Sequence, residues 1–458
     1  MQFDDGLPPR QRLLAFASVG LTTFVAVLDA AIANIALPPL TQAFGVEPAE
    51  AVWVVNAYQI AITMVLLPLA SLGEIAGYRR VYVGGLALFT AASLLCALSP
   101  TLPILILARA LQGLGAAGIM SINIALVRFI YPRAMLGRAV GNVAVIVAVA
   151  SAAGPSIAGA ILAVAPWQAL FLVNVPIGIA AFLLGRKSLP PSPLADRRLD
   201  VGGVVLGAAT FGLVISGVNS LGTSDSQTLA VTQICLGLVV GVVFVRQQLQ
   251  LPVPMLPVDL LRRPVFALSA VTSVCAFGAQ AVAVVSLPFY LHDTLGHSAA
   301  ETGLLLTPLP LATALAAFIS GRAADRVAQP GLLAAIGLAI FAAGLASLAL
   351  LPAAPSDLDL MWRLVVTGLG FGLFQAPNNK VLIASAPRER SGGAGAIQST
   401  GRLVGQSLGV AGLAVVFGLI PDQPVTVALG AATLLAALAI LPSALRRFER
   451  EPAAGTSP

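Results

Sequence analysis

Apolar residues follow one another in long stretches along nearly the whole chain. At about 1.5 Å per residue, a helix of about 20 residues crosses a hydrocarbon layer about 30 Å thick. The strands of an outer-membrane barrel would instead give short segments of alternating polarity. The runs therefore predict fourteen spanning helices, at about 13–38, 51–72, 80–99, 102–127, 138–164, 168–185, 201–220, 228–245, 265–290, 301–321, 331–352, 361–385, 394–419 and 424–445.

Lys and Arg residues gather in every second connection between these helices. Of the 25 Lys and Arg residues, Arg109, Arg363 and Arg402 fall well inside predicted helices. The others lie at the termini, in connections on one side or in the helix ends beside those connections, and acidic residues such as Glu47 and Asp293 occupy the other side. The positive-inside rule then predicts a multi-pass protein of the bacterial cytoplasmic (inner) membrane with both termini in the cytoplasm.

Composition narrows the class further. The chain is 58% hydrophobic and 10% charged, whereas soluble domains are about a quarter charged. Its net charge of +6 is placed to face anionic lipid, so we expect the lipid membrane and no nucleic acid as a partner. No phosphate-binding loop, metal-ligand cluster or nucleophile–base pairing is visible, which predicts neither an enzyme nor a cofactor.

Asp29 is the candidate functional residue that stands out most clearly. It lies near the middle of the first predicted helix, about 13 Å along the helix axis from Pro38. A charge at that depth is costly unless it faces water, a partner or a cargo. Asp29 could take up a proton from outside, release it inside, and pair with a cationic cargo in between. The alternative is a structural acid that is hydrogen-bonded to neighbouring backbone or to Asn34.

Arg109 is a second charge inside a predicted helix, in the outer half of the membrane. Its guanidinium suits two-point contact with carbonyls or a carboxylate. Because it stays protonated, it could only set the protonation of a neighbour or orient a water; the alternative is a polar staple between helices. Arg402 has Gln398 and Gln406 one turn away on the same helix face. These polar neighbours favour a role for Arg402 in packing or cavity lining over a role in proton coupling.

Short motifs recur about 250 residues apart. Arg109-x-x-x-Gly113-x-Gly115 is echoed by Arg363-x-x-x-x-Gly368-x-Gly370. The Ala70–Arg80 segment after the second helix is likewise echoed by the Gly321–Arg326 segment after the tenth. Repeated halves predict a transporter with a site near the membrane midplane. We expect an N-terminal six-helix bundle at 1–190, a linker with two inserted helices at 191–262, and a C-terminal six-helix bundle at 263–458.

These motifs resemble the fourteen-helix drug:proton antiporters of the major facilitator superfamily. The resemblance covers nearly the whole chain and rests on Leu28–Pro38, Arg109-x-x-Gln112-Gly113-x-Gly115, Gly154-Pro155-x-x-x-Gly159, Asn174-x-Pro176, Asp200-x-x-Gly203 and Pro377-Asn378-Asn379. It implies an all-α polytopic fold of two six-helix bundles plus two extra helices. It also implies proton-driven export of hydrophobic, often cationic compounds, with Arg109 taking part in proton transfer.

Several further residues are candidates for conformational roles. Gly154, Pro155 and Gly159 allow close helix contact, which we expect to seal the inner side between the halves; ordinary small-residue packing is the alternative. The connection after the second helix and its echo carry charges that could pair in one conformation and separate in the other. These residues are Glu74, Gly77, Arg79 and Arg80, and Asp325 with Arg326.

The cargo is expected to be a small molecule that exchanges with protons through a chain acting as a monomer. Tyr58, Gln59 and Gln375 are the candidate cargo contacts beside Asp29. Two alternatives to drug efflux by alternating access remain open. One is a proton symporter that imports a small metabolite, and the other is a membrane sensor or scaffold that transports nothing.

Overall fold

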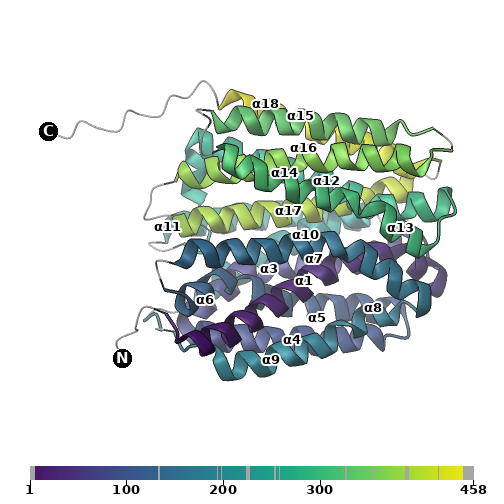
Figure 1. Cartoon of the computed structure of the whole chain (residues 1–458). Helices are drawn as coiled ribbons and strands as arrows, with labels where there is room; N and C mark the ends of the chain where they lie inside the picture. The colour runs from purple at the N-terminus through teal and green to yellow at the C-terminus, as the bar shows by residue number, and fades with distance from the viewer. Residues whose placement is uncertain are drawn as a thin grey trace. The chain divides into compact units, whose positions relative to one another are not determined.

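The computed structural model of the chain is built from helices over the residues that it describes (Figure 1). Those residues are 6–132, 135–192, 194–196, 199–222, 227–251, 254–256, 258–324, 327, 329–352, 354–386, 391–420 and 422–446. The α-helices are α1 Pro9–Phe44, α2 Pro48–Ala51, α3 Trp53–Ala76, α4 Tyr78–Ala97, α5 Leu102–Met120, α6 Asn123–Ile130, α7 Leu136–Val164, α8 Gln168–Leu172, α9 Asn174–Ser188, α10 Val201–Ser220, α11 Gln227–Gln250, α12 Pro264–Phe289, α13 Ala299–Leu306, α14 Pro308–Ala324, α15 Pro330–Ala349, α16 Asp357–Ala384, α17 Ser391–Leu419 and α18 Pro424–Leu445. A 3-10 turn, Val258–Arg262, precedes α12, and a π turn, Tyr290–Thr294, follows it.

Thirteen helical segments in the described part are long and apolar enough to cross a membrane. They coincide with thirteen of the stretches expected from the sequence. The remaining stretch, 361–385, is also helical as α16, which is long enough but too polar in composition to join that group. The all-α, membrane-spanning fold predicted from the apolar runs is therefore confirmed.

Local chemistry sets where several helices begin and end. Gly45 follows α1 in the left-handed conformation, with φ of 62°, and its N–H donates to the carbonyl of Thr41. A residue with a side chain rarely adopts this φ, which explains why glycine ends the helix. The side chains of Asp200, Ser298 and Ser356 accept hydrogen bonds from the first turns of α10, α13 and α16. These caps satisfy backbone N–H groups that have no partner inside a helix.

The chain forms two compact units. Unit 1 contains residues 1–255, 284–307 and 410–424, and unit 2 contains residues 256–283, 308–409 and 425–458. Because α12 and α17 each contribute residues to both units, the units do not follow chain order. The division at residues 190 and 262 that the sequence suggests stays a prediction.

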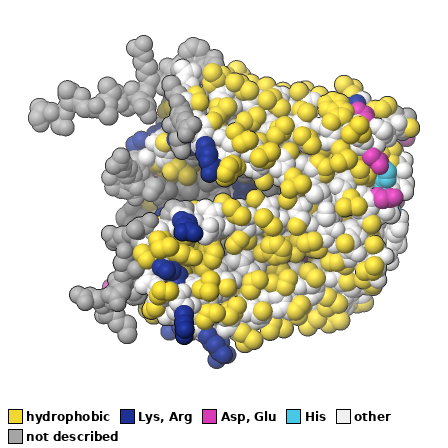
Figure 2. Space-filling view, viewed as in Figure 1, with side chains coloured by type: hydrophobic (Ala, Val, Ile, Leu, Met, Phe, Trp, Pro, Cys, Tyr) yellow, Lys and Arg dark blue, Asp and Glu magenta, His cyan; other side chains and the backbone are white. Residues whose placement is uncertain are grey.

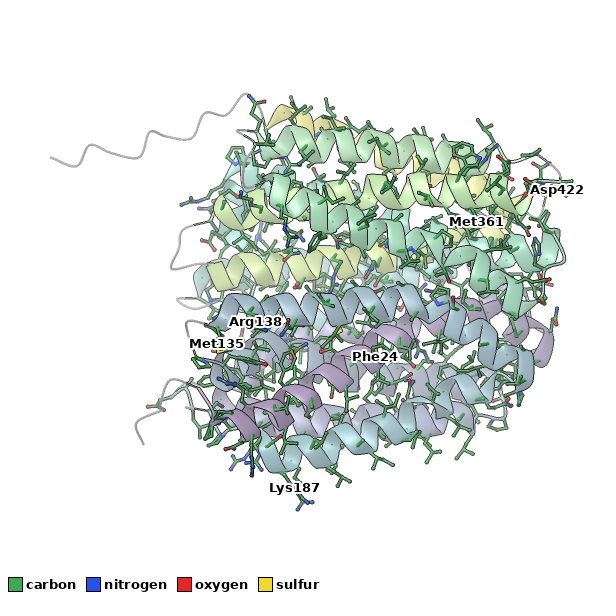
Figure 3. All side chains as sticks on the ribbon, viewed as in Figure 1. Phe24, Met135, Arg138, Lys187, Met361 and Asp422 are labelled. Carbon is green, nitrogen blue, oxygen red and sulfur yellow. The ribbon has the colours of Figure 1, made fainter. Side chains whose placement is uncertain are left out.

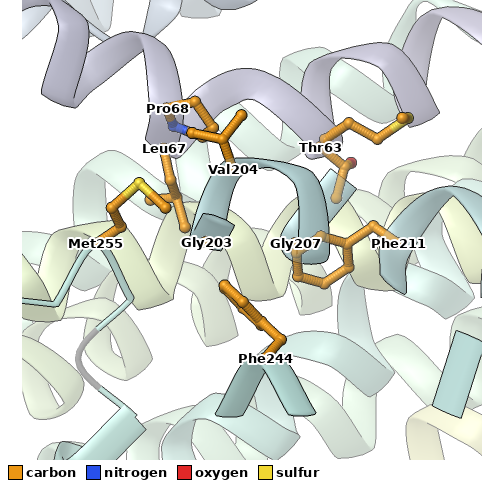
Figure 4. A pocket seen from close by; sticks show the side chains of 10 residues that line it. Thr63, Leu67, Pro68, Gly203, Val204, Gly207, Phe211, Phe244 and Met255 are labelled. Atoms are coloured by element: carbon orange, nitrogen blue, oxygen red, sulfur yellow. The ribbon is translucent and has the colours of Figure 1, made fainter. Parts of the chain in front are cut away.

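In unit 1, α5 lies against both α3 and α4, and α1 packs against α7 and α9. The inserted helices α10 and α11 pack against each other, and α10 also contacts α3. Figure 4 shows a small apolar pocket at that contact, where Leu67 and Pro68 of α3 approach Gly207 of α10 and Phe244 of α11. Its lining is almost entirely hydrocarbon, which fits helix packing rather than binding of a polar cargo.

The surface visible in Figure 2 is largely apolar along the helices, and its Lys and Arg side chains lie near helix ends. Large apolar side chains stay exposed along several helices, for example Val205 at 60% and Leu238 at 58%. In water, exposure of so much apolar surface would drive association. Lipid chains are the solvent that matches it, so the surface supports a multi-pass membrane protein.

Candidate functional site

Asp29 lies in the middle of α1 and is 1% exposed. Both of its carboxylate oxygens are held by side chains from other helices. Arg109 Nη1 donates to Oδ2 over 2.6 Å, and Oδ1 accepts from Gln112 Nε2 at 2.8 Å and Asn174 Nδ2 at 2.6 Å. Asn34, the partner considered from the sequence, instead donates to the carbonyl of Ala30 on its own helix. The carboxylate is therefore fully paired inside the helix packing.

Arg109 is also 1% exposed and is held from several directions. Its Nε donates to the carbonyl of Val54 over 3.1 Å, and its guanidinium carbon lies 4.3 Å from the ring centre of Tyr58. The ring of Phe171 is 5.6 Å away. Aromatic faces attract a cation most strongly where water is excluded. These contacts fix the guanidinium beside Asp29 and offset part of the cost of removing it from water.

Gln112 extends the hydrogen-bond network of Asp29 and Arg109 to α4. It accepts a hydrogen bond from Arg109 Nη1 through Oε1 and donates to Ser93 Oγ over 2.9 Å. Cys96 on α4 also approaches Gln112 Oε1, at 3.7 Å from sulfur to oxygen. We call Asp29, Arg109, Gln112, Asn174 and Tyr58 the Asp29 cluster. It joins α1, α3, α5 and α9 within unit 1 and reaches α4 through Ser93.

The sequence identified Asp29 and Arg109 separately but did not pair Asp29 with Asn174. Asn174 is the first residue of α9, buried at 0% exposure, and 145 residues from Asp29 along the chain. The sequence separation of the two residues does not indicate this contact. Asn174 could still have been identified as a candidate, because it is a polar side chain among apolar residues and a buried amide needs a hydrogen-bond partner.

The other predicted cargo contacts lie in different surroundings. Tyr58 is 3% exposed and packs on Arg109, so its ring belongs to the Asp29 cluster. Gln59 on α3 and Gln375 on α16 are partly exposed. Gln375 belongs to unit 2, whereas Tyr58 and Gln59 belong to unit 1. Cargo contact by Gln59 and Gln375 stays a prediction.

The connection between α3 and α4 and its flanks contain Glu74, Arg79 and Arg80, the charged residues of the first repeat for which a conformational role is predicted. Gly77, with φ of 99°, ends α3 and precedes α4. Among the described residues, no ion pair joins Glu74 to Arg79 or Arg80. Arg79 Nη2 donates to the carbonyl of Arg186, and Arg80 Nη1 to that of Ala76. Pairing of Glu74 with these arginines in one conformation therefore stays a prediction; Asp325 and Arg326 lie outside the described residues.

The small residues of α7 make two close contacts inside unit 1. A Cβ on Gly154 would overlap Ala31 of α1, and a Cβ on Gly159 would lie 2.9 Å from the carbonyl oxygen of Ala300. Gly303 of α13 packs in turn against the carbonyl of Pro155. The small residues thus allow α7 to approach α1 and α13 closely. That this contact seals the inner side between the halves stays a prediction.

The close contact at Gly159 predicts that a larger side chain there destabilises the protein. Gly159→Val would push its side chain into the carbonyl groups of Ala299 and Ala300, and we expect it to lower stability by about 1–3 kcal/mol and to impair transport. Ala160→Val is the matched control, since Ala160 is exposed on the next position of the same helix. Thermal unfolding in detergent and flux into proteoliposomes measure both effects. Equal behaviour of the two variants would contradict the role of the α7–α13 contact.

The repeat seen in the sequence has a matching contact pattern in each unit. In unit 1, Gly113 packs on the carbonyl of Tyr58 in α3, and Gly115 packs on the backbone of Phe89 in α4. In unit 2, Gly368 packs on Leu309 of α14 and Gly370 on Phe341 of α15, again through backbone atoms. Each glycine pair thus lets one helix approach two neighbours closely.

Residues 19–410, and in a second overlapping match residues 268–457, fit the sequence pattern described as the Major Facilitator Superfamily. The chain belongs to the Major Facilitator Superfamily. In the described part, no three His, Cys, Asp or Glu side chains are grouped so that they could hold a metal ion. The paired charges of the Asp29 cluster are thus the candidate chemistry of this superfamily member.

Curated relatives of this superfamily member are transporters. The chain is 52% identical over 444 residues to the uncharacterized transporter YebQ of Escherichia coli K12, covering 96% of this chain and 97% of YebQ. It is 30% identical over 407 residues to the riboflavin transporter RibZ of Clostridioides difficile 630, covering 88% and 87%. It is also 30% identical over 408 residues to the multidrug resistance protein Stp of Mycobacterium tuberculosis, covering 88% and 75%.

A solved structure shares the superfamily fold. It is a bacterial homolog of the human lysosomal transporter Spinster in an inward-facing, occupied conformation. The alignment has a TM-score of 0.71 and covers 98% of this chain and 100% of the other, at 14% identity. Together with the sequence match, this confirms the major-facilitator fold that the motif resemblance implies. The chain is therefore a multi-pass membrane transporter of that superfamily.

Proposed function

We propose that this transporter is a proton-coupled antiporter that exports hydrophobic compounds, cationic ones among them, across the bacterial cytoplasmic membrane by alternating access. The observation that carries the proposal is the buried ion pair between Asp29 and Arg109 inside a membrane-spanning bundle. Such a pair is costly to maintain, and hydrophobic residues of similar volume would pack as well or better. A structure without a need for charge has little reason to keep it at this depth.

The chemistry of the pair suits a proton switch. When a proton binds an oxygen of Asp29, the carboxylate becomes a neutral acid and its electrostatic attraction to Arg109 is lost. Arg109 stays charged and keeps its hydrogen bond to Val54 and its contact with the Tyr58 ring. The α1–α5 contact is thereby weakened while the α3–α5 contact persists. Protonation therefore biases helices that have two packing arrangements toward the arrangement without the ion pair.

Protein side chains occupy both oxygens of Asp29 in this structure. A cationic compound could pair with it only after Arg109 has moved away. Proton and cargo would then compete for the same carboxylate in turn, which is the exchange that an antiporter needs. In this proposal, Asp29 contacts the cargo directly only after the ion pair with Arg109 has opened.

The direction of transport and the cargo rest on likeness. The fifth-helix motif, Gly154-Pro155-x-x-x-Gly159, is typical of antiporters, and Stp carries the name of a multidrug resistance protein. RibZ carries the name of a riboflavin transporter, so a single metabolite is the alternative cargo to test. The charge pattern along the chain supports placing both termini in the cytoplasm.

Flux into proteoliposomes tests the proposal. We expect ethidium, a lipophilic cation, to move against an imposed proton gradient when wild-type protein is present, and riboflavin to move less. Liposomes without protein give the leak rate. Movement of riboflavin together with protons, and no movement of ethidium, would favour the symporter. No gradient-dependent movement of a wide panel of compounds would favour a sensor or scaffold.

A further inference from the structure

Three arginines surround one cavity at the end of the α3–α4 pair in unit 1. The cavity has a volume of about 570 Å³, and its lining includes Arg79 and Arg80 of α4, Arg186 of α9, and Ser192 from the segment after α9. No Asp or Glu is among the described residues that line it. Three guanidinium groups therefore share a concave space without a carboxylate on its wall.

The hydrogen bonds of Arg79 and Arg80 go to neutral acceptors. Arg79 donates to the carbonyl of Arg186 and Arg80 to that of Ala76, and both acceptors are neutral. None of the three takes part in an ion pair among the described residues. Like charges held close together repel one another, so an anion in the cavity would lower the energy of this arrangement.

The direction of α4 adds to the positive potential. Arg79 and Arg80 lie in its first turn, which contains no acidic residue. The N-terminal end of a helix carries a partial positive charge, so cations there are unfavourable and anions favourable. Two arginines in a first turn therefore indicate a site that is stabilised by an anion from outside the chain.

An apolar stripe leads from the cavity along the membrane-spanning part of α9. Ile179 and Leu183 are 49% and 52% exposed and, with exposed Arg186, recur every three or four residues on one face of α9. On α4, which contacts α9, Leu88 and Leu95 are exposed as well. Lys187 follows Arg186 and points away from the helices (Figure 3). A stripe of this kind suits an acyl chain whose headgroup reaches the arginines.

We propose that the cavity lined by Arg79, Arg80, Arg186 and Ser192 binds the phosphate of an anionic phospholipid. The guanidinium groups hold the phosphate oxygens, the Ser192 hydroxyl donates to one of them, and the acyl chains lie along α9 and α4. Basic pockets between membrane helices are suited to such headgroups, because arginine offers paired donors to phosphate. Bound lipid would brace the α3–α4 connection against the segment after α9.

Native mass spectrometry of the full-length protein in detergent tests this site. The probes are phosphatidylglycerol, zwitterionic phosphatidylcholine and inorganic phosphate. We expect phosphatidylglycerol to bind wild-type protein and raise its unfolding temperature, and to bind the Arg79→Gln/Arg80→Gln/Arg186→Gln variant at least about tenfold more weakly. The single variants Arg80→Gln and Arg186→Gln, at exposed positions, give intermediate affinities if the triple variant folds poorly.

A variant of equal charge separates this site from general attraction to lipid. Arg10→Gln/Arg246→Gln/Arg262→Gln removes three exposed arginines elsewhere and is expected to keep wild-type affinity. Equal losses in both triple variants, or no loss in either, would overturn the proposal. Protection by inorganic phosphate that matches the effect of lipid would identify free phosphate as the ligand and overturn the lipid assignment. Because the readout is lipid binding, it does not depend on the proposed antiport.

Discussion

Asp29→Asn is expected to reduce gradient-driven export to the leak rate of liposomes without protein. The amide cannot take up and release a proton as a carboxylate does. It also leaves Arg109 as a buried cation without a counter-charge, which costs about 3–5 kcal/mol of stability. Flux in proteoliposomes and thermal unfolding in detergent measure the two effects separately.

Loss of transport by misfolding must be distinguished from loss of coupling. Asp29→Asn/Arg109→Gln removes both charges, and we expect it to recover much of the stability while export stays at the leak rate. Thr41→Val is a control on the same helix, since Thr41 donates only to the carbonyl of Pro38 within α1. Export by the double variant at the wild-type rate, still responsive to the proton gradient, would remove Asp29 from the mechanism.

Gly115→Ala is expected to destabilise the protein by about 3 kcal/mol or more, although alanine is the best helix former. An added Cβ would overlap the backbone nitrogen of Phe89 and lie 2.7 Å from the carbonyl oxygen of Gly85. Both obstacles are backbone atoms of α4, so α5 and α4 would have to separate. The free energy of unfolding, from denaturant titration in detergent, gives the measurement.

The second copy of the repeated motif offers an equivalent variant, and two glycines outside the motif serve as controls. Gly370→Ala should have a similar cost in unit 2, because its Cβ would overlap the backbone of Phe341. Gly84→Ala on α4 and Gly412→Ala on α17 meet nothing within 4 Å, and we expect them to be neutral or stabilising by about 0.5–1 kcal/mol. A similar loss in all four variants would show that close packing is not the cause.

Some residues of the site can be identified from the sequence alone, whereas their contacts cannot. Asp29 and Arg109 could be found without coordinates, since each is a charge within an apolar run long enough to span a membrane. Their pairing could not be found, because 80 residues separate them and nothing in either helix specifies which face meets which. The arginines near Glu74 are a different case: a charge pattern predicts that Arg79 and Arg80 pair with it in one conformation, and in this structure both donate to carbonyl groups. The pairing stays a prediction.

By itself, the sequence determined the number and place of the spanning helices, their expected orientation and the superfamily. The helices and their expected orientation follow from hydrophobic length and charge asymmetry, which are local properties that a bilayer selects directly. The superfamily follows from the resemblance of short motifs. The contacts of Asn174, the helix that packs against Gly159, and the arginine cavity were decided only by the tertiary structure. They depend on the rotation of each helix about its axis, which is set by contacts between residues far apart in the chain.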